Sequence, residues 1–153
     1  MPRKNILTIL TQEHREVDRL LSSLAKAPAA ERPLLFSRLQ QELGSHAAFE
    51  EQRVYPCLLG EEGEDRALAL EGEEEHLQMK RLLAEMAQMP TDDPRWEAKL
   101  KVLTENVQHH VEEEQEEMFP QLREVLGKEQ LFALAEEYGQ SRSAAPAVAA
   151  VSG

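Results

Sequence analysis

Four of the five histidines in this sequence fall on apolar helical stripes, where an imidazole is unusual. Two of these four are followed, four residues later on the same stripe, by a glutamate. Residues four apart share one face of a helix, so each such pair directs an imidazole and a carboxylate to one point. Charged side chains are almost never fully buried unless they are paired or bind a metal ion. We therefore predict a metal site formed by His14, His46, Glu50, His76, His110 and Glu114.

An internal repeat supports this choice more strongly than the spacing does. Acidic residues are so frequent, 29 of 153, that His14 and His109 also have an acid four residues later. However, the segments that begin at His46 (HAAFEEQRVYP) and His110 (HVEEEQEEMFP) share His, Glu at +4, an aromatic residue at +9 and Pro at +10. The segments that begin at His14 (HREVDRLL) and His76 (HLQMKRLL) share Arg at +5 and Leu-Leu at +6 and +7. The chain therefore reads as two similar helical hairpins, each of which supplies two imidazoles and one carboxylate.

This donor set indicates a particular class of metal ion. Imidazole suits zinc, copper, iron and nickel, whereas carboxylates suit harder ions, so the mixture fits iron or manganese. Two carboxylates that face each other can each bridge two ions, and two histidines then remain for each ion. A metal also resolves the cost of burying two carboxylates together, which would otherwise force a proton onto at least one. The residues alone thus predict a dinuclear centre.

The pattern of His14, His46-x-x-x-Glu50, His76 and His110-x-x-x-Glu114 resembles the hemerythrin-like (HHE cation-binding) family, over about residues 5–126. The resemblance implies two iron ions joined by an oxo or hydroxo bridge inside a left-handed four-helix bundle, with manganese or zinc as less suitable ions. It also implies the role of each ligand. Glu50 and Glu114 would bridge the ions, the first two histidines would bind one iron, and the last two would bind the other.

One position departs from the oxygen-carrying members of that family. Those proteins have a histidine four residues before the histidine of the third helix, and here that position is Gly72. We expect Glu73, Glu75 or water to fill the missing place. The predicted function is the binding of O2 or a related small ligand (NO or peroxide) for sensing, carriage or scavenging. An iron-storage or metal-buffering module and an iron-dependent peroxide-decomposing oxidoreductase stay open as alternatives. The pattern favours a binding protein and assigns no catalytic residue.

The elements that must position these residues are helices. Good helix formers dominate the sequence, apolar residues recur at alternating steps of three and four, and turn residues fall in clusters. Short loops between successive helices favour antiparallel neighbours, so we predict an all-α, up-down-up-down four-helix bundle. Asn5 and Asp93 are the expected N-caps. We assign residues 1–139 to the metal-binding bundle and residues 140–153 to a flexible tail. The helices are expected at about 5–27, 31–59, 64–89 and 94–126, with a short C-terminal helix at about 128–138.

The composition excludes several other classes of function. With 17 basic and 29 acidic residues, the net charge of −12 argues against binding to nucleic acid or to an anionic membrane surface. A single cysteine, Cys57, excludes an intrachain disulfide. The sequence contains no apolar run near the ~18 residues of a membrane span, and no signal peptide is recognised, so we expect a cytoplasmic protein. Tyr55 and Phe119 are expected to pack at the end of the bundle.

Overall fold

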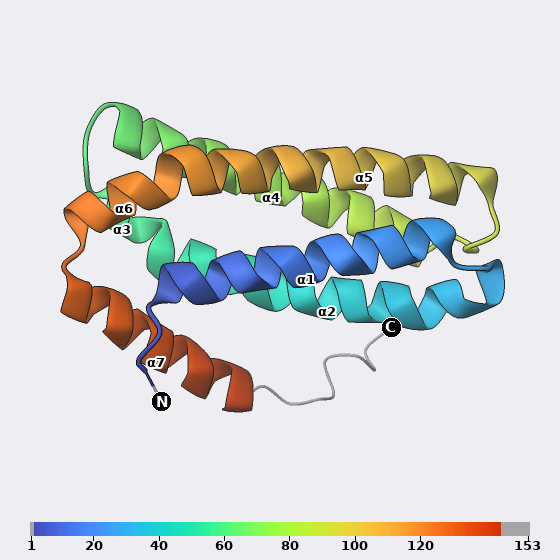
Figure 1. Ribbon diagram of the computed structural model, residues 1–153. Coiled ribbons are helices and arrows are strands. Elements are labelled where there is room, and N and C mark those ends of the chain that lie inside the picture. The colour runs from blue at the N-terminus through green and yellow to red at the C-terminus, as the bar shows by residue number, and fades with distance from the viewer. Residues whose placement is uncertain (1, 145–153) are drawn as a thin grey trace.

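Helices make up every regular element in the part of the chain that the structure describes, which confirms the predicted all-α class (Figure 1). The structure is a computed structural model, and it describes residues 2–144. The elements in chain order are α1 Ile6–Lys26, the 3-10 turn η1 Ala29–Glu31, α2 Arg32–Phe49, the π-helical segment η2 Glu50–Val54, α3 Pro56–Leu59, α4 Glu64–Ala87, α5 Pro94–Glu113, the π-helical segment η3 Glu114–Met118, α6 Phe119–Val125 and α7 Lys128–Ala144.

Both expected N-caps begin their helices. The Oδ1 atom of Asn5 accepts a hydrogen bond of 2.9 Å from the backbone N–H of Thr8, in the first turn of α1. Asp93 accepts in the same way from the N–H of Arg95, at 2.8 Å, and Pro94 is the first residue of α5. A proline is tolerated there because the first N–H groups of a helix have no partner within the helix. These caps fix the register of the two helices that carry His14 and His110.

Two π-helical turns interrupt the helices that were expected to be continuous at 31–59 and 94–126. Each begins at a glutamate of the predicted site, and in each a backbone N–H bonds to the carbonyl five residues earlier, as from Tyr55 to Glu50 at 2.7 Å. A proline follows directly, Pro56 in one segment and Pro120 in the other. Because proline has no N–H and its ring crowds the preceding turn, the normal α-helical ladder cannot continue there, and the helix widens. The two π turns therefore lie at equivalent positions in the two copies of the internal repeat.

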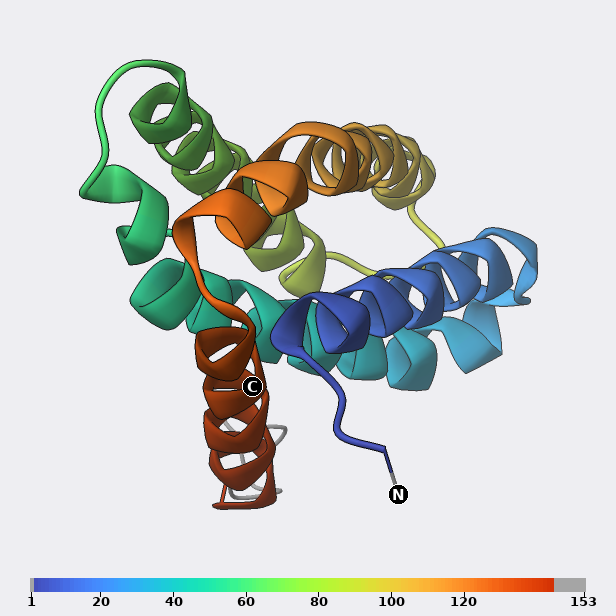
Figure 2. The ribbon, with the colours of Figure 1, turned by 60° about the vertical axis from the view of Figure 1, so that its left-hand side comes forward.

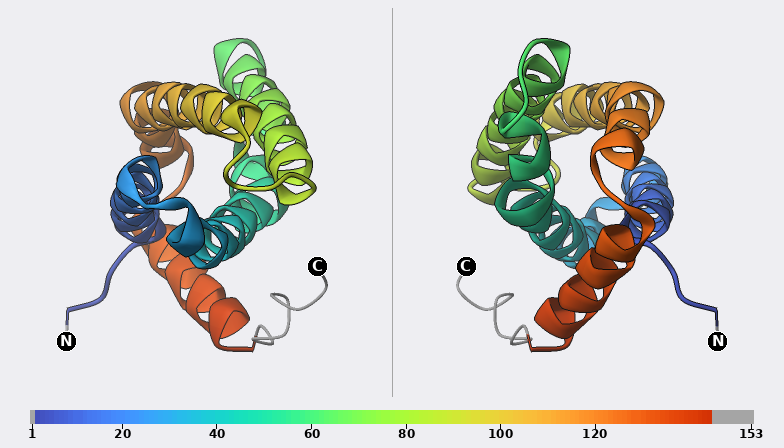
Figure 3. Two further views of the ribbon diagram at one scale, coloured as in Figure 1. Left: turned by 90° about the vertical axis from the view of Figure 1, so that its right-hand side faces the viewer. Right: turned by 90° about the vertical axis from the view of Figure 1, so that its left-hand side faces the viewer.

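The helices α1, α2, α4 and α5 surround a common interior when the molecule is viewed along its length (Figure 3). Their apolar residues form two clusters. Along each of these four helices, one cluster lies before the histidine of the predicted site and the other lies after it. For α2 and α5, the residues after the histidine include those of the π turn that continues the helix. One cluster contains Trp96 and Leu39, and the other contains Tyr55, Phe119 and Leu58. The six predicted ligands therefore lie between two apolar cores.

A fifth long helix, α7, is the main difference from the predicted arrangement. It was expected to end near residue 138, but it continues to Ala144 and lies outside the ring of four helices, against α1 (Figure 2). Arg142, which the sequence placed in the tail, forms ion pairs with Glu13 of α1 and, at 3.1 Å, with Glu42 of α2. These pairs extend the helix through a segment that composition alone marked as tail. The rest of the predicted tail, residues 145–153, lies outside the described residues.

Among residues 2–144, no helix is both long enough and apolar enough to span a lipid bilayer.

Candidate metal centre

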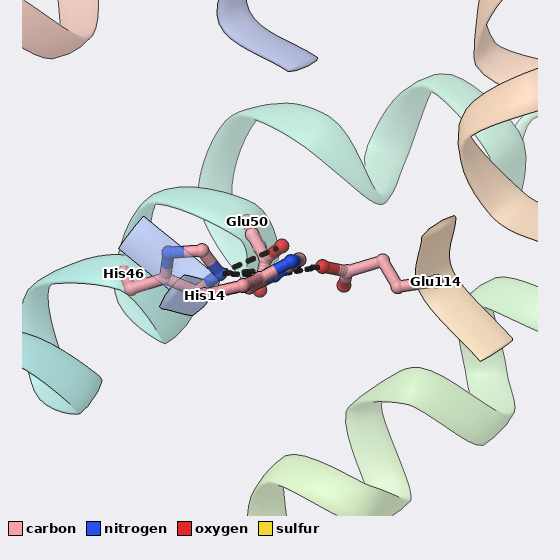
Figure 4. A group of neighbouring side chains, drawn as sticks. All are labelled: His14, His46, Glu50 and Glu114. Atoms are coloured by element: carbon pink, nitrogen blue, oxygen red, sulfur yellow. Dashed lines mark hydrogen bonds and ion pairs between the residues drawn. The ribbon is translucent and has the colours of Figure 1, made fainter. Parts of the chain in front are cut away.

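The structure brings all six predicted site residues together in the interior. Figure 4 shows one group of four of them, His14, His46, Glu50 and Glu114. The four imidazoles are buried, and Glu50 and Glu114 have no exposed surface. His14 comes from α1, His46 from α2, His76 from α4 and His110 from α5. The two glutamates stand at the first residue of each π turn, one helical turn beyond His46 and His110. The apolar stripes of the sequence thus converge on one polar centre.

The six residues form two groups of four donors, and both groups contain Glu50 and Glu114. The first adds His14 and His46, the second adds His76 and His110, and the donor atoms of each group lie within 4.8 Å of one another.

Each carboxylate presents one oxygen to each group. Glu50 places Oε2 3.2 Å from Nε2 of His46 and Oε1 3.2 Å from Nε2 of His76. Glu114 places Oε1 2.9 Å from Nε2 of His14 and Oε2 3.2 Å from Nε2 of His110.

A second layer of side chains orients the imidazoles. The Nδ1 atom of every site histidine lies within hydrogen-bond distance of a side-chain oxygen, which accepts its proton: Gln115 for His14 (2.7 Å), Glu13 for His46 (2.8 Å), Glu51 for His76 (3.0 Å) and Glu75 for His110 (2.7 Å). A neutral imidazole that donates from Nδ1 has a bare lone pair on Nε2. All four lone pairs therefore point into the centre, as they do in histidines that bind metal ions.

The centre has the electrostatics of a cation site. The Nε2 atoms of His14 and His46 lie 3.1 Å apart, and those of His76 and His110 are also 3.1 Å apart. In the buried carboxylates, both oxygens of Glu50 and Oε1 of Glu114 have no hydrogen-bond donor, since the nearby imidazoles approach without hydrogen-bond geometry. Converging lone pairs and orphaned carboxylate oxygens repel one another unless a positive charge lies between them. The residues present therefore fit bound metal.

The pKa values of the site residues show that protons on the imidazoles can balance the negative charge of the two buried carboxylates. Burial by itself would lower the pKa of His46, but the carboxylates of Glu50 and Glu13 outweigh it and raise the pKa to about 10. Burial acts in the same direction on His110, and Glu114 reverses it, so that this pKa rises well above its ordinary value. Burial would raise the pKa of Glu114, but the facing His110 holds it well below its usual range. Metal binding must therefore displace protons from these imidazoles.

Residues 5–122 match the sequence pattern of the hemerythrin HHE cation-binding domain. The chain belongs to the hemerythrin HHE cation-binding family. A hemerythrin HHE cation-binding domain-containing protein from Mycobacterium kansasii has a similar crystal structure, with a TM-score of 0.80 and 25% sequence identity, over 92% of this chain and 86% of that one.

Two curated relatives are longer than this chain. An uncharacterised hemerythrin-like protein of Schizosaccharomyces pombe is 30% identical over 108 residues, which are 69% of this chain and 52% of that protein. A DNA nickase of Nostoc sp. is 26% identical over 140 residues, which are 91% of this chain and 39% of the nickase. The chain thus spans about half or less of the length of these relatives.

Tyr55 is a residue of the centre that the sequence reasoning missed. It was expected to pack at the bundle end, but its side chain has no exposed surface and its hydroxyl enters the polar interior. That hydroxyl donates a hydrogen bond of 2.7 Å to Oε2 of Glu114. It also lies 3.2 Å from Nε2 of His76 and 3.3 Å from Nε2 of His110. The signal available in the sequence was the aromatic residue at +9 of the repeat, which is tyrosine in one copy and phenylalanine in the other.

The space beside Gly72, where oxygen-carrying hemerythrins have a further histidine, is occupied by Tyr55. A Cβ atom at Gly72 would lie 3.0 Å from both Cζ and the hydroxyl oxygen of Tyr55. Glu75, one of the expected substitutes, instead supports His110 from behind at Nδ1. Glu73, the other, is half-buried on α4 and belongs to neither donor group of the centre. The prediction that a nearby glutamate fills the missing place is therefore not what the structure shows, because the tyrosine ring already takes the room.

A small apolar cavity adjoins the four imidazoles. Its volume is about 50 Å³, and apolar side chains such as Val17, Leu43 and Val107 form most of the remaining wall. One water-sized molecule needs roughly 10–15 Å³ of such space. The cavity therefore has room for a molecule of about three to five heavy atoms at most. Tyr55 is not part of its lining, so the cavity and the tyrosine approach the centre from different sides.

Proposed function

We propose that this hemerythrin-family protein binds two iron ions and, at that centre, O2 or a related small ligand such as NO or peroxide, for sensing, carriage or scavenging. The observation that supports it most directly is the sharing of Glu50 and Glu114 by both donor groups. One oxygen of each carboxylate in each group is the arrangement that two bridged ions require. The mixture of imidazoles and carboxylates favours iron over softer ions that prefer sulfur ligands and over harder ions that prefer oxygen ligands alone.

The roles of the residues follow from their positions. His14 and His46 would hold one ion and His76 and His110 the other, within the antiparallel up-down arrangement of α1, α2, α4 and α5. Bound iron supplies ligand binding and electron transfer to small oxygen or nitrogen molecules. The protein excludes water with the two apolar clusters and fixes each imidazole through its Nδ1 partner. Metal-ligating histidines commonly depend on such partners for ring orientation and basicity.

The cavity supports the proposed class of ligand. Its apolar walls favour small uncharged molecules over ions, and its volume of about 50 Å³ excludes organic substrates of ordinary size. It reaches all four imidazoles, so a ligand inside it would meet either metal position.

Iron loading with optical spectroscopy tests the proposal. We expect close to two iron ions per chain after anaerobic loading with ferrous iron and exposure to air. Glu114→Ala should abolish this binding. Asp18→Ala should leave it unchanged, because Asp18 is exposed, belongs to neither donor group, and accepts a hydrogen bond from Gln108. An iron content near zero in the unmodified protein would refute the proposal.

Ligand titration separates binding from the alternatives. A stable spectral adduct with azide or NO would support a binding protein. Steady evolution of O2 from peroxide would support the iron-dependent enzyme. Iron that continues to accumulate well beyond two per chain would support storage.

A further inference from the structure

The helix α7 lies outside the ring of four helices and meets it with an apolar stripe that ends in two polar groups (Figure 3). The buried residues of the stripe are Leu131, Leu134, Ala135 and Tyr138. The same face continues one turn further to Arg142, because residues four apart share a face of a helix. The hydroxyl of Tyr138 donates a hydrogen bond of 2.7 Å to Oε1 of Glu13 on α1, and the guanidinium of Arg142 pairs with Oε2 of the same carboxylate. Both polar groups therefore meet at one side chain of the bundle.

Glu13 connects this face of α7 to the metal centre. Its Oε1 atom, which accepts the hydrogen bond of Tyr138, also accepts the Nδ1 proton of His46 at 2.8 Å. Arg142 is itself fixed, since it donates to the Tyr138 hydroxyl at 3.2 Å and to Glu42 of α2 at 3.1 Å. Only 14% of the Glu13 side chain is exposed, so little water competes for its oxygens. A continuous chain of hydrogen bonds thus runs from α7 through Glu13 to a residue of the centre.

The other three imidazoles are supported from within the ring of four helices and its π turns. The acceptors of their Nδ1 protons are Gln115 on η3, Glu51 on η2 and Glu75 on α4. Glu51 has a further partner, Lys80, which is also on α4. Among these four acceptors, and within the part of the chain that the structure describes, Glu13 alone bonds to α7. The apolar stripe is sufficient to bury the face of α7, and the polar groups at its end add a connection to one imidazole in particular.

We propose that Tyr138 and Arg142 are positioning residues for His46, acting through Glu13, so that metal binding and the docking of α7 strengthen each other. This inference rests on the proposed metal function of the centre. A fixed Glu13 keeps the imidazole oriented with its Nε2 lone pair toward the ion, and loss of such a partner commonly weakens metal binding. Coupling between two binding events is reciprocal. If docked α7 raises the affinity for metal by a given factor, bound metal raises the ratio of docked to detached α7 by the same factor. The state of the buried centre thus reaches an outer helix.

Competition with a chelator, on the iron-loaded protein, measures the first direction. The double variant Tyr138→Phe with Arg142→Met removes both α7 donors to Glu13 but keeps the apolar stripe. We expect its affinity for iron to fall about fivefold or more, as is usual for coupled sites. Glu137→Gln is the matched control, because Glu137 also fastens α7 to the bundle, by an ion pair of 2.7 Å with Arg53 of η2, but does so without Glu13. This control should leave the affinity unchanged.

Hydrogen–deuterium exchange, followed by mass spectrometry, measures the reverse direction. Backbone amides of α7 should exchange about fivefold or more slowly in the iron-loaded protein than in the metal-free protein. In the double variant this effect of metal on α7 should disappear, while the effect on α1 and α5, which carry site residues themselves, should persist. A merely structural role for Tyr138 and Arg142 would instead speed the exchange of α7 equally with and without metal.

The outcomes distinguish this inference from the proposed function. If the unmodified protein binds no iron, the proposed function fails and the inference fails with it. If the protein binds iron but the double variant keeps its full affinity, or if α7 exchanges at the same rate with and without metal, only the inference is wrong.

A Glu13→Ala background tests the route. There the double variant should lose no further affinity, and a further loss would show that α7 acts without Glu13, which also contradicts the inference. Circular dichroism checks the fold of each variant. Arg142→Met alone, at a side chain that is 32% exposed, provides the same comparisons if the double variant does not fold.

Discussion

Replacing Gly72 with alanine tests whether Tyr55 is fixed against α4 in the way described, without any metal. Alanine is favoured over glycine within a helix by about 1 kcal/mol, so the change alone should stabilise α4. The new Cβ would, however, meet Tyr55 at 3.0 Å. The ring cannot easily withdraw, since it is fully buried, stacked on His76 and hydrogen-bonded to Glu114. Overpacking of this kind costs about 1–3 kcal/mol, so we expect a net destabilisation of about 0–2 kcal/mol.

Gly139 provides the matched control. It also lies inside a helix, α7, but a Cβ there would have no heavy atom within 4 Å. Gly139→Ala should therefore stabilise the protein by roughly 0.5–1 kcal/mol. For a chain of this size a change of 1 kcal/mol shifts the unfolding midpoint by about 2–4 °C. The control should raise the midpoint, and Gly72→Ala should lower it or leave it nearly unchanged.

The assay is thermal unfolding followed by circular dichroism, in the presence of a chelator so that metal does not contribute. Two further variants, Tyr55→Leu alone and Tyr55→Leu with Gly72→Ala, complete a double-mutant cycle. In the Tyr55→Leu background, where the ring is absent, Gly72→Ala should recover the stabilisation seen at Gly139. If Gly72→Ala in the unmodified background raises the midpoint as much as Gly139→Ala does, Tyr55 is not held against Gly72. The inference that the ring of Tyr55 occupies the space beside Gly72 would then be refuted.

Three further predictions concern the layers around the centre. Glu13→Ala removes the acceptor of the His46 Nδ1 proton and a partner of Arg142, so the affinity for iron, measured by competition with a chelator, should fall about 10–100-fold while Asp18→Ala leaves it unchanged. Gly44 lines the cavity with open space around it, so Gly44→Leu should slow NO binding about tenfold in stopped-flow measurements, as an added barrier of about 1.4 kcal/mol would, with no change in iron content. Removal of iron with a chelator should lower the unfolding midpoint of the unmodified protein, because a metal that binds only the native state stabilises it. The midpoint of Glu114→Ala should not respond to the chelator, because this variant has no bound iron to lose.

The sequence was sufficient to predict the main helices and the six inward-facing site residues, because both depend on local periodicity. His46 and Glu50 share a helical face whatever the rest of the chain does. The same pair recurs at His110 and Glu114, and this repeat distinguished the site residues from the other histidines that have an acid four residues later. The π turns were not predicted, although Pro56 and Pro120 stood at equivalent positions in the repeat. A proline usually ends or kinks a helix, and the sequence does not show that the chain would widen by one residue and continue.

The second layer and Tyr55 could not be read from the sequence, because they depend on contacts between helices. Glu13 and Glu51 are two among 29 acidic residues, and nothing local distinguishes a carboxylate that supports an imidazole from one that faces solvent. Tyr55 enters the centre only because Gly72, on another helix, leaves room for its ring. The continuation of α7 likewise depends on Arg142 meeting Glu13 and on the packing of Tyr138 against Phe49.

The two halves of the centre, built from one repeat, are chemically unequal. In the first half, His14 donates to the neutral amide oxygen of Gln115, and the adjacent ring is that of Phe119. In the second half both imidazoles donate to carboxylates, and the phenol oxygen of Tyr55 is added. Carboxylate partners make an imidazole a more basic ligand. The second half therefore presents the more basic pair of imidazoles to a cation, although both groups hold four donors. The Tyr55 hydroxyl lies 3.2 Å from His76 and 3.3 Å from His110, so beside those two imidazoles the space is already occupied from the side opposite the cavity.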